Sequence, residues 1–505
     1  MLCKQTLVSW LAAVVAFVAS TASMASAQGG PKDVDTTCGL KVKLEQVGSM
    51  PLGGSNIASP VPYRNNNLLL IDTEKGKIYV DKQADGIPTE IFDAFDDTPA
   101  GLDFNFQDLL TEYVTNVADG PSNNELYVAF QSKTVPPGIN SNSIYYLPPP
   151  IVEGHSWIPF AGPLAVSEPQ DLYRLGDLPT SAVDPNTGQE ATCGFTTFCC
   201  ICNPFFPATT YSVFHVIYKF KFTGNKLSDP VPLAAFETQT GPTHKGGGMT
   251  ALPDGRVLYA TGDALPFGTN GREGAQDNVS SVSKLFVIDS TGNVELLAKG
   301  LRQPQRLEIL QTTPPMLAIG EIGGVTAEEI NVYPLHELLD PSIIENFGWG
   351  IGPDGFGREG TFYTAPGTAG IFGTQPPAVG TAPTPEPGYI QPHAQYGRFD
   401  ASQFIAVTGP VGSTTSFTGN IKLLFADLPS GTFLATTGTP GTYGVDEPIC
   451  SVTIVDAAND GVEYANAVDF AGTGARVDPR FFKYPDNTAG VIFESTGVYY
   501  RVTEV

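Results

Sequence analysis

Positive charge is scarce in this sequence. Lysine and arginine together number 27, against 52 aspartates and glutamates, so the formal net charge is −25. A surface of that sign repels the phosphates of nucleic acid and the headgroups of anionic lipid, so neither is a predicted partner. The same charge balance is also typical of a secreted protein that has to stay soluble.

Long apolar runs are missing as well, except near the N-terminus. Lys4 precedes an apolar run over residues 7–18, and Ala25-Ser26-Ala27 offers the small residues of a cleavage site. This pattern is typical of a secretory signal peptide over residues 1–27, and its apolar run is too short to span a bilayer. We expect the mature chain, residues 28–505, to be secreted and extracellular, with no membrane span.

Long helices are not favoured by the composition. Charged residues make up only 16 % of the chain, whereas it has 55 glycines, 43 prolines, 30 phenylalanines and 19 tyrosines. Glycine and proline end regular elements, and aromatic residues favour strands. Only Ala327–Leu339 resembles a helix, so the sequence predicts an all-β protein.

Short apolar strands recur in pairs, with a polar turn inside each pair. Segments of this kind lie at 67–72 with 76–80, 123–130, 249–252 with 257–260, 284–289, 423–427 with 431–435, and 491–493 with 497–500. Hairpins over this length fit a β-propeller, a β-helix or paired sandwiches. Because variable loops follow the hairpins, we favour a propeller formed as one domain, with long insertions at 131–210 and 350–395. Residues 28–60 show few strand signals and read as a lead-in.

The cysteines fit an oxidising compartment. Cys3 leaves with the signal peptide, and six cysteines remain: Cys38, Cys193, Cys199, Cys200, Cys202 and Cys450. An even number in a secreted chain predicts disulfides, although the sequence does not give their pairing. The cluster from 193 to 202 is open to a metal role too, but it has no nearby histidine and no zinc-finger spacing, which favours a disulfide-tied loop.

One run, residues 243–263, carries most of the chemical information. His244 precedes Gly246-Gly247-Gly248, and a Pro253-Asp254-Gly255 turn then joins two short strands. The glycines leave room for a molecule to approach the backbone, and a neutral imidazole accepts a proton from a substrate hydroxyl. A histidine that only hydrogen-bonds inside the sheet fits the same pattern.

Two further runs follow within one hairpin unit of the first. One is Gly300-Leu301-Arg302-Gln303-Pro304-Gln305-Arg306, and the other comprises 320–324, Glu328-Glu329-Ile330-Asn331 and Asn346-Phe347-Gly348-Trp349-Gly350. An arginine binds carboxylates or quinone oxygens through two parallel hydrogen bonds. The alternatives are a surface arginine before a turn and a solvated acidic face.

In order and spacing, these three runs resemble the soluble quinone-dependent glucose/sorbosone dehydrogenase family. The resemblance extends from about 251 to 350 and resumes at 407–409 and 424–431, a pattern also shared with hedgehog-interacting-type propellers. It implies a six-bladed β-propeller that oxidises a sugar with pyrroloquinoline quinone (PQQ) and calcium. It also implies an electron acceptor that reoxidises the cofactor.

The resemblance assigns roles to particular residues. His244 stands at the family's catalytic base, which takes the hydroxyl proton of the sugar as hydride passes to the quinone. Arg302 and Gln303 stand where the family has a cofactor-binding arginine and asparagine. Arg476 and Arg480 are candidates for the cofactor-binding arginines that precede the last blade.

The same resemblance locates the metal. Gly323 and Gly324 stand where the family supplies two backbone carbonyls to calcium, a cation that prefers oxygen ligands. Glu329 is a candidate ligand for a second, structural calcium.

The chain also departs from the family. Pro429 stands where some members have a quinone-binding lysine, and Gln303 replaces the usual asparagine. PQQ carries three carboxylates, and burying them with few cations is unfavourable. A secreted propeller that has lost its cofactor and binds glycan or protein through its loops is therefore the alternative prediction.

Overall fold

The computed structural model describes most of the chain after residue 33. The described residues are 34–51, 57–104, 113–122, 124–147, 181–183, 190–192, 212–223, 225–239, 246–264, 274–323, 327–351, 357–359, 362–364, 388–397, 406–438, 440, 447–459, 461–474 and 476–505. The predicted signal peptide, His244, Gly324 and the cysteine cluster at 193–202 lie outside them. Within the described part, no helix is long and apolar enough to cross a membrane.

The described part is nearly all β. One sheet contains β2 (Val61–Tyr63), β3 (Asn67–Asp72), β4 (Lys77–Asp81) and β5 (Pro88–Asp93). The next has the order β6 (Val114–Asp119), β7 (Glu125–Ser132), β11 (Ser212–Phe222), β12 (Leu227–Gln239) and β8 (Ile144–Tyr145). The third has the order β13 (Gly246–Ala251), β14 (Val257–Thr261), β15 (Lys284–Ile288), β16 (Val294–Lys299) and β20 (Glu345–Asn346).

Two further sheets follow. The fourth contains β17 (Pro304–Leu310), β18 (Met316–Glu321), β19 (Ala327–Pro334) and β24 (Ala394–Gly397). A nine-stranded sheet has the order β25 (Val411–Gly412), β26 (Leu423–Ala426), β27 (Phe433–Thr436), β28 (Ile449–Asp456), β1 (Val34–Ser49), β32 (Val498–Glu504), β31 (Ala489–Phe493) and β30 (Pro479–Lys483), with β29 (Glu463–Tyr464) beside β28.

The remaining elements are small. They are the pair β9 (Ser181–Val183) and β10 (Glu190–Thr192), the sheet β21 (Gly350–Ile351), β22 (Gly357–Glu359) and β23 (Phe362–Thr364), the short helices α4 (Leu335–Leu338) and α5 (Ala467–Ala471), and the 3₁₀ helices η1 (Lys82–Ala84) and η2 (Ser141–Ser143).

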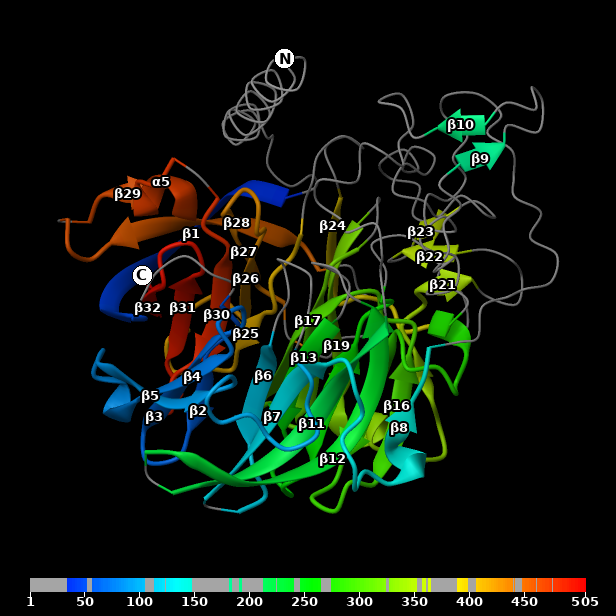
Figure 1. Cartoon of the computed structure of the whole chain (residues 1–505). Coiled ribbons are helices and arrows are strands. Elements are labelled where there is room, and N and C mark those ends of the chain that lie inside the picture. The colour runs from blue at the N-terminus through cyan, green and yellow to red at the C-terminus, as the bar shows by residue number, and fades with distance from the viewer. Residues whose placement is uncertain are drawn as a thin grey trace, which may run out of the picture.

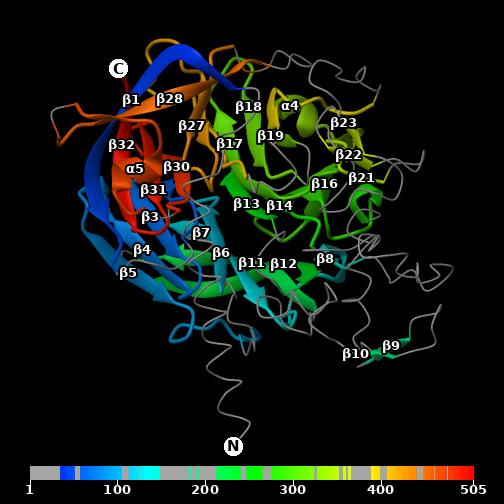
Figure 2. The same ribbon diagram turned by 90° about the horizontal axis from the view of Figure 1, so that it is seen from above.

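The large sheets stand around a common axis in a propeller-like arrangement (Figure 1, and from above in Figure 2). The first strand of each unit faces inward and contacts the first strand of the next. These contacts join β2 to β6, β6 to β13, β13 to β17, β17 to β25, β25 to β30, and β30 to β2. Apolar clusters fill the junctions between units, as where Tyr127 of β7 and Met249 of β13 meet Phe286 of β15. The core is therefore divided among the junctions between sheets.

The predicted hairpins are confirmed. Antiparallel pairs form between β3 and β4, β13 and β14, β15 and β16, β26 and β27, and β31 and β32. Each combines an apolar run, which a sheet buries, with a turn rich in Asp, Asn or Gly. For example, Asp289 accepts hydrogen bonds from the backbone N–H groups of Thr291 and Asn293.

The lead-in prediction for residues 28–60 is wrong over its described part. Residues 34–49 form the long strand β1, which pairs parallel with β28 and antiparallel with β32. Its buried Leu40, Val42 and Leu44 alternate with more exposed residues, the period of a half-buried strand. The partners that stabilise it come from the C-terminal end of the chain, which local sequence signals do not reveal.

The helix predicted at Ala327–Leu339 is also wrong. Residues 327–334 form β19, and only the single turn α4 is helical. β19 lies between β18 and β24 and pairs with both. Hydrogen bonds on both sides of the strand outweigh the weak helical preference of Ala-Glu-Glu.

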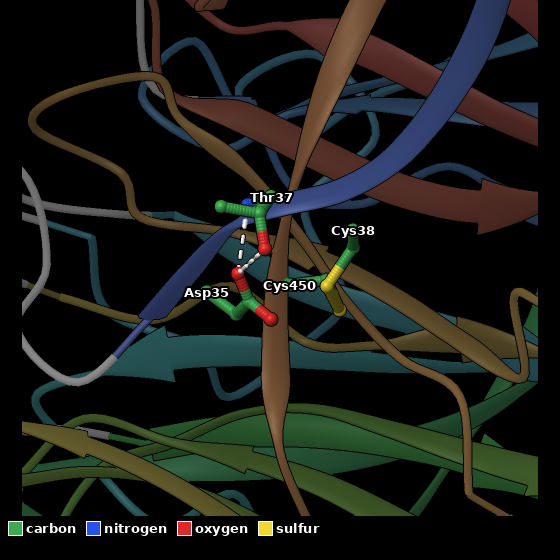
Figure 3. Close-up of a disulfide and its surroundings, with 4 residues drawn as sticks. All are labelled: Asp35, Thr37, Cys38 and Cys450. Carbon is green, nitrogen blue, oxygen red and sulfur yellow. Dashed lines mark hydrogen bonds between the residues drawn. A yellow bond between two sulfur atoms is a disulfide. The ribbon is translucent and has the colours of Figure 1, made fainter.

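A disulfide joins Cys38 of β1 to Cys450 of β28 (Figure 3). The two cysteines are 412 positions apart in the sequence. This bond confirms that cysteines outside the 193–202 cluster pair, and it fastens the N-terminal strand to the nine-stranded sheet.

Candidate functional site

One end of the central axis gathers the segments that precede the inner strands. Gln305 of β17 accepts a hydrogen bond from Arg480 Nη1 of β30 at 2.8 Å, and Glu308 and Lys483 meet three residues further along at 2.5 Å. β17 and β30 therefore run in the same direction. Gly246, which begins β13, pairs with Thr261 at the end of β14. The starts of these strands lie at the same end of the molecule.

Arg302 is held at this end. Its residue is only 8 % exposed, so the alternative of a surface arginine is wrong. Its backbone N–H donates to Glu321 Oε1 at 2.5 Å, and its Nη1 donates to the carbonyl of Ile322 at 2.9 Å. The guanidinium carbon lies 5.4 Å from the ring centre of Trp349, within cation–π range. The cation is fixed by contacts on several sides.

Backbone hydrogen bonds join three strand ends around Arg302. The N–H of Asp263, just past β14, donates to the carbonyl of Arg302 at 2.7 Å. The N–H of Ile322, just past β18, donates to the carbonyl of Gln303 at 3.2 Å. Asp263 and Gln303 are both buried. The structure thus brings the predicted pair Arg302 and Gln303 together with an acidic residue that sequence reasoning did not select.

A pair of buried carboxylates lies beside this junction. Glu321 of β18 is directly opposite Glu329 of β19, and Asn331 Nδ2 donates to one oxygen of each at 3.2 Å. Burial first, and then the carboxylate of Glu329, raises the pKa of Glu321 well above its ordinary value. Glu329 is 6 % exposed, so the alternative of a solvated acidic face is wrong. Such a pair is stabilised by a shared proton or by a cation.

Gly323 lies just past the end of β18, and its backbone N–H donates to a third buried glutamate, Glu328. Glu328 Oε2 accepts from the N–H of Gly323 at 3.3 Å and from the N–H of Val407 at 2.9 Å. Glu328 is fully buried and connects the turn after β18 to the segment before β25. Among the residues that the structure describes, no three His, Cys, Asp or Glu side chains are grouped to hold a metal ion. A cation here would depend on backbone and amide oxygens as well.

His244 precedes Gly246 by two positions and lies outside the described residues. The glycines after it are described. Gly247 has a φ of 96° and accepts a hydrogen bond from Asn116 Nδ2 of β6 at 2.8 Å. A side chain at Gly246 would overlap the backbone of Thr261 and Gly262. Gly246 therefore allows β13 and β14 to approach closely, and Gly247 adopts a backbone conformation that favours glycine.

The two C-terminal arginines differ in their surroundings. Arg480 donates through Nε and Nη2 to Glu494 Oε2 at 3.1 and 2.8 Å, and through Nη1 to Gln305. Arg476 forms an ion pair with Asp478, and its side chain is 45 % exposed. The structure brings Arg480 to the strand that follows Arg302, whereas Arg476 pairs with Asp478 two positions along its own segment.

Three residues of this junction were not selected from the sequence: Asp263, Glu321 and Trp349. Glu321 ends an apolar strand in which it is the only charged residue, and Asp263 follows another apolar strand. A carboxylate in an otherwise apolar strand is a signal of a buried polar site, because an unpaired charge is costly to bury. That signal was present in the sequence for Glu321.

Sequence comparisons find no match, whereas structural comparisons find proteins of similar fold. No family model matches the chain, and no curated protein matches it. The PQQ-bound aldose sugar dehydrogenase from Streptomyces coelicolor aligns over 93 % of this chain and 100 % of its own, with a TM-score of 0.51 and 13 % identity. An oxidoreductase (glucose dehydrogenase) from Thermus thermophilus aligns over 92 % and 100 %, with a TM-score of 0.51 and 14 % identity. The chain therefore shares the fold of these two dehydrogenases.

Proposed function

We propose that this protein is a secreted PQQ-dependent sugar dehydrogenase built on a six-bladed propeller. The observation that carries the proposal is the meeting of Arg302, Gln303 and Gly323 at one end of the axis, in the order that the family resemblance implies. Six blades are supported by the apolar clusters at the junctions between units, six in the described part. The nine-stranded sheet then counts as two blades joined through β28 and β1.

The described residues fit the cofactor and its metal in chemical terms. Arg302 is a preorganised cation, the kind of group that binds quinone oxygens or carboxylates. Asp263, Glu321 and Glu329 add buried acidic groups, so a divalent cation near Gly323 would offset negative charge. Calcium favours the carbonyl and carboxylate oxygens found here. When bound, PQQ supplies the quinone that accepts a hydride from the sugar.

The chain supplies the remaining groups. His244 would accept the proton of the sugar hydroxyl on an imidazole nitrogen, because a neutral histidine is a competent base near pH 7. Arg302 would stabilise the negative charge that develops on the quinone oxygens. Gln303, with Arg476 or Arg480, would anchor the cofactor, and Gly323 and Gly324 would present carbonyls to calcium. An external acceptor would remove the electrons.

A non-catalytic propeller that binds glycan or protein is the second candidate. The surroundings of Arg480 favour this second candidate, because all three side-chain nitrogens of Arg480 already donate to Glu494 or Gln305. Pro429, where a lysine binds the quinone in some relatives, removes another cation. Fewer available cations weaken the binding of a tricarboxylate.

Reconstitution distinguishes the two candidates. Purified protein is mixed with PQQ and calcium, cofactor binding is followed by absorbance, and reduction of an artificial dye is followed with a panel of sugars. Cofactor binding with sugar-dependent dye reduction supports the dehydrogenase. Folded protein that neither binds PQQ nor reduces the dye contradicts it and leaves the binding protein.

A His244→Ala variant tests the base. We expect it to bind PQQ as the unaltered protein does and to turn over about 10²- to 10⁴-fold more slowly, the range of a lost general base. Full activity in this variant would remove His244 from the mechanism.

A further inference from the structure

We infer that Glu321 and Trp349 are positioning residues for Arg302: together they fix where its guanidinium stands, without themselves taking part in the chemistry. The effect on cofactor binding rests on the proposed function. The positioning of Arg302 does not, because it is a property of the protein without any cofactor. Neither residue belongs to the set predicted from the sequence.

Glu321 holds the backbone. One carboxylate oxygen accepts the N–H of Arg302 at 2.5 Å, and the other accepts Asn331 Nδ2 at 3.2 Å. The carboxylate is thereby oriented from both sides, on a residue that is 3 % exposed. The bond to Arg302 determines where the chain turns into β17, and hence where the side chain of Arg302 begins.

Trp349 holds the side chain. Its ring lies 5.4 Å from the guanidinium carbon, and it is 7 % exposed. The carbonyl of Ile322 accepts Nη1 of Arg302 at 2.9 Å and fixes the rotation of the guanidinium. An aromatic face and a carbonyl acting together leave the cation few alternative positions.

Trp349 is itself fixed from its backbone. Its N–H donates to the carbonyl of Gly300 at 2.9 Å, and its carbonyl accepts Gln276 Nε2 at 2.7 Å. Gln276 also exchanges hydrogen bonds with Asn346 at 2.8 and 3.1 Å. The platform under Arg302 is therefore connected to the start of the same segment, Gly300 to Arg302, and does not move independently of it.

A structural role alone would have a different signature. If Glu321 only stabilised the fold, its loss would lower the melting temperature without moving Arg302 relative to Trp349. Glu308 provides the matched control, since it is an equally buried glutamate on neighbouring β17 that contacts Arg306 and Lys483 instead of Arg302.

The first test needs no cofactor. The sequence contains three tryptophans, and Trp10 lies in the predicted signal peptide, so replacing Trp157 by phenylalanine leaves Trp349 as the only tryptophan of the mature chain. In this background we expect Arg302→Ala and Glu321→Ala to change Trp349 emission and acrylamide quenching in the same way. Glu321→Gln, which keeps an acceptor oxygen for the Arg302 N–H, should retain the original emission, as should Glu308→Ala. An unchanged spectrum in Glu321→Ala, or an equal change in Glu308→Ala, overturns the inference.

The second test measures PQQ affinity in the presence of calcium. Loss of a group that orients a ligand typically weakens binding roughly 10- to 100-fold, and we expect that loss in Glu321→Ala with rescue in Glu321→Gln. Trp349→Phe should keep most of the affinity and Trp349→Leu should lose it, which tests the platform even if Glu321→Ala does not fold. Equal affinity in all four variants contradicts the inference. If the unaltered protein does not bind PQQ, the proposed function fails, and the emission test still decides the positioning.

Discussion

Glu308 of β17 and Lys483 of β30 form a buried ion pair, with 2.5 Å between Oε1 and Nζ, although the strands that carry them are far apart in the sequence. Arg306 Nη2 contacts the other oxygen of Glu308 at 2.6 Å. Burial raises the pKa of the Glu308 carboxyl, but the charges of Lys483 and Arg306 outweigh it and hold the pKa below its ordinary value. One carboxylate thus links two inner strands across the central axis.

Removing this carboxylate should destabilise the protein. We expect Glu308→Gln to lower the free energy of unfolding by about 3–5 kcal/mol at pH 7, because two buried cations lose their partner. Since the folded pKa is lowered, the contribution is complete above the unfolded value and is lost as pH falls through the folded one. Denaturant titrations from pH 7 to pH 3 should show that the difference in free energy of unfolding between Glu308→Gln and the unaltered protein becomes smaller. Asp229→Asn, at an exposed ion pair with Lys221, is the control and should change nothing measurable.

Glu321 should show the opposite pH dependence. Its pKa is raised by burial and by Glu329, so the folded protein retains a proton that the unfolded chain releases above about pH 4.3. Stability is therefore lost as pH rises through the window above that value. In calcium-free buffer, Glu321→Gln should match the unaltered protein near pH 4 and be more stable at pH 8. If the difference in stability between Glu321→Gln and the unaltered protein is the same at pH 4 and at pH 8, Glu321 does not retain its proton in the folded state.

Calcium should stabilise the protein through Glu329, the candidate calcium ligand. A cation that binds only the folded state raises the free energy of unfolding by about 2.7 kcal/mol at a concentration of 100 Kd. We expect calcium to raise the melting temperature of the unaltered protein and of Glu308→Gln, and Glu329→Gln to lose most of the shift. An equal calcium shift in Glu329→Gln would place the cation elsewhere.

The Cys38–Cys450 disulfide should contribute to stability by restricting the unfolded chain. It closes a loop of 412 positions, and loss of a native disulfide typically costs about 2–5 kcal/mol. The double variant Cys38→Ser/Cys450→Ser should unfold at lower denaturant concentration than the unaltered protein under oxidising conditions. If the two unfold at the same concentration, the bond does not form in solution or adds nothing. Addition of reductant to the unaltered protein is a separate comparison, because it also acts on the other cysteines.

The local pattern of apolar and turn residues was enough to predict the strands whose partners are near in sequence. The run 67–72 and the run 257–260 are apolar and bounded by turn residues, and each pairs with its sequence neighbour. β1 and β19 were predicted wrongly for the opposite reason. β1 is held by two strands from the C-terminal end, and β19 gains hydrogen bonds from β24, a strand distant in the sequence.

The candidate site also has features that the sequence predicts and features that it does not. The spacing of His244, Arg302 and Gly323 along the chain was available to sequence reasoning, and so was the resemblance that relates them. The contact of Arg302 with Glu321 and Trp349 was not, because it depends on how the ends of β17 and β18 and the segment after β20 meet. The sequence did not predict the hydrogen bond from Arg480 to Glu494 either.

The sequence by itself determined the strands whose partners are near in sequence, their turns and the acidic charge, since these follow from local alternation, glycine and proline positions, and composition. Only the tertiary structure decided which charges are buried and which residues face one another. Glu321 is buried opposite Glu329 of the neighbouring strand, and Glu308 is buried between two cations, where the packing of strands excludes water. The energy of a charge depends on that exclusion, and no short stretch of sequence encodes it.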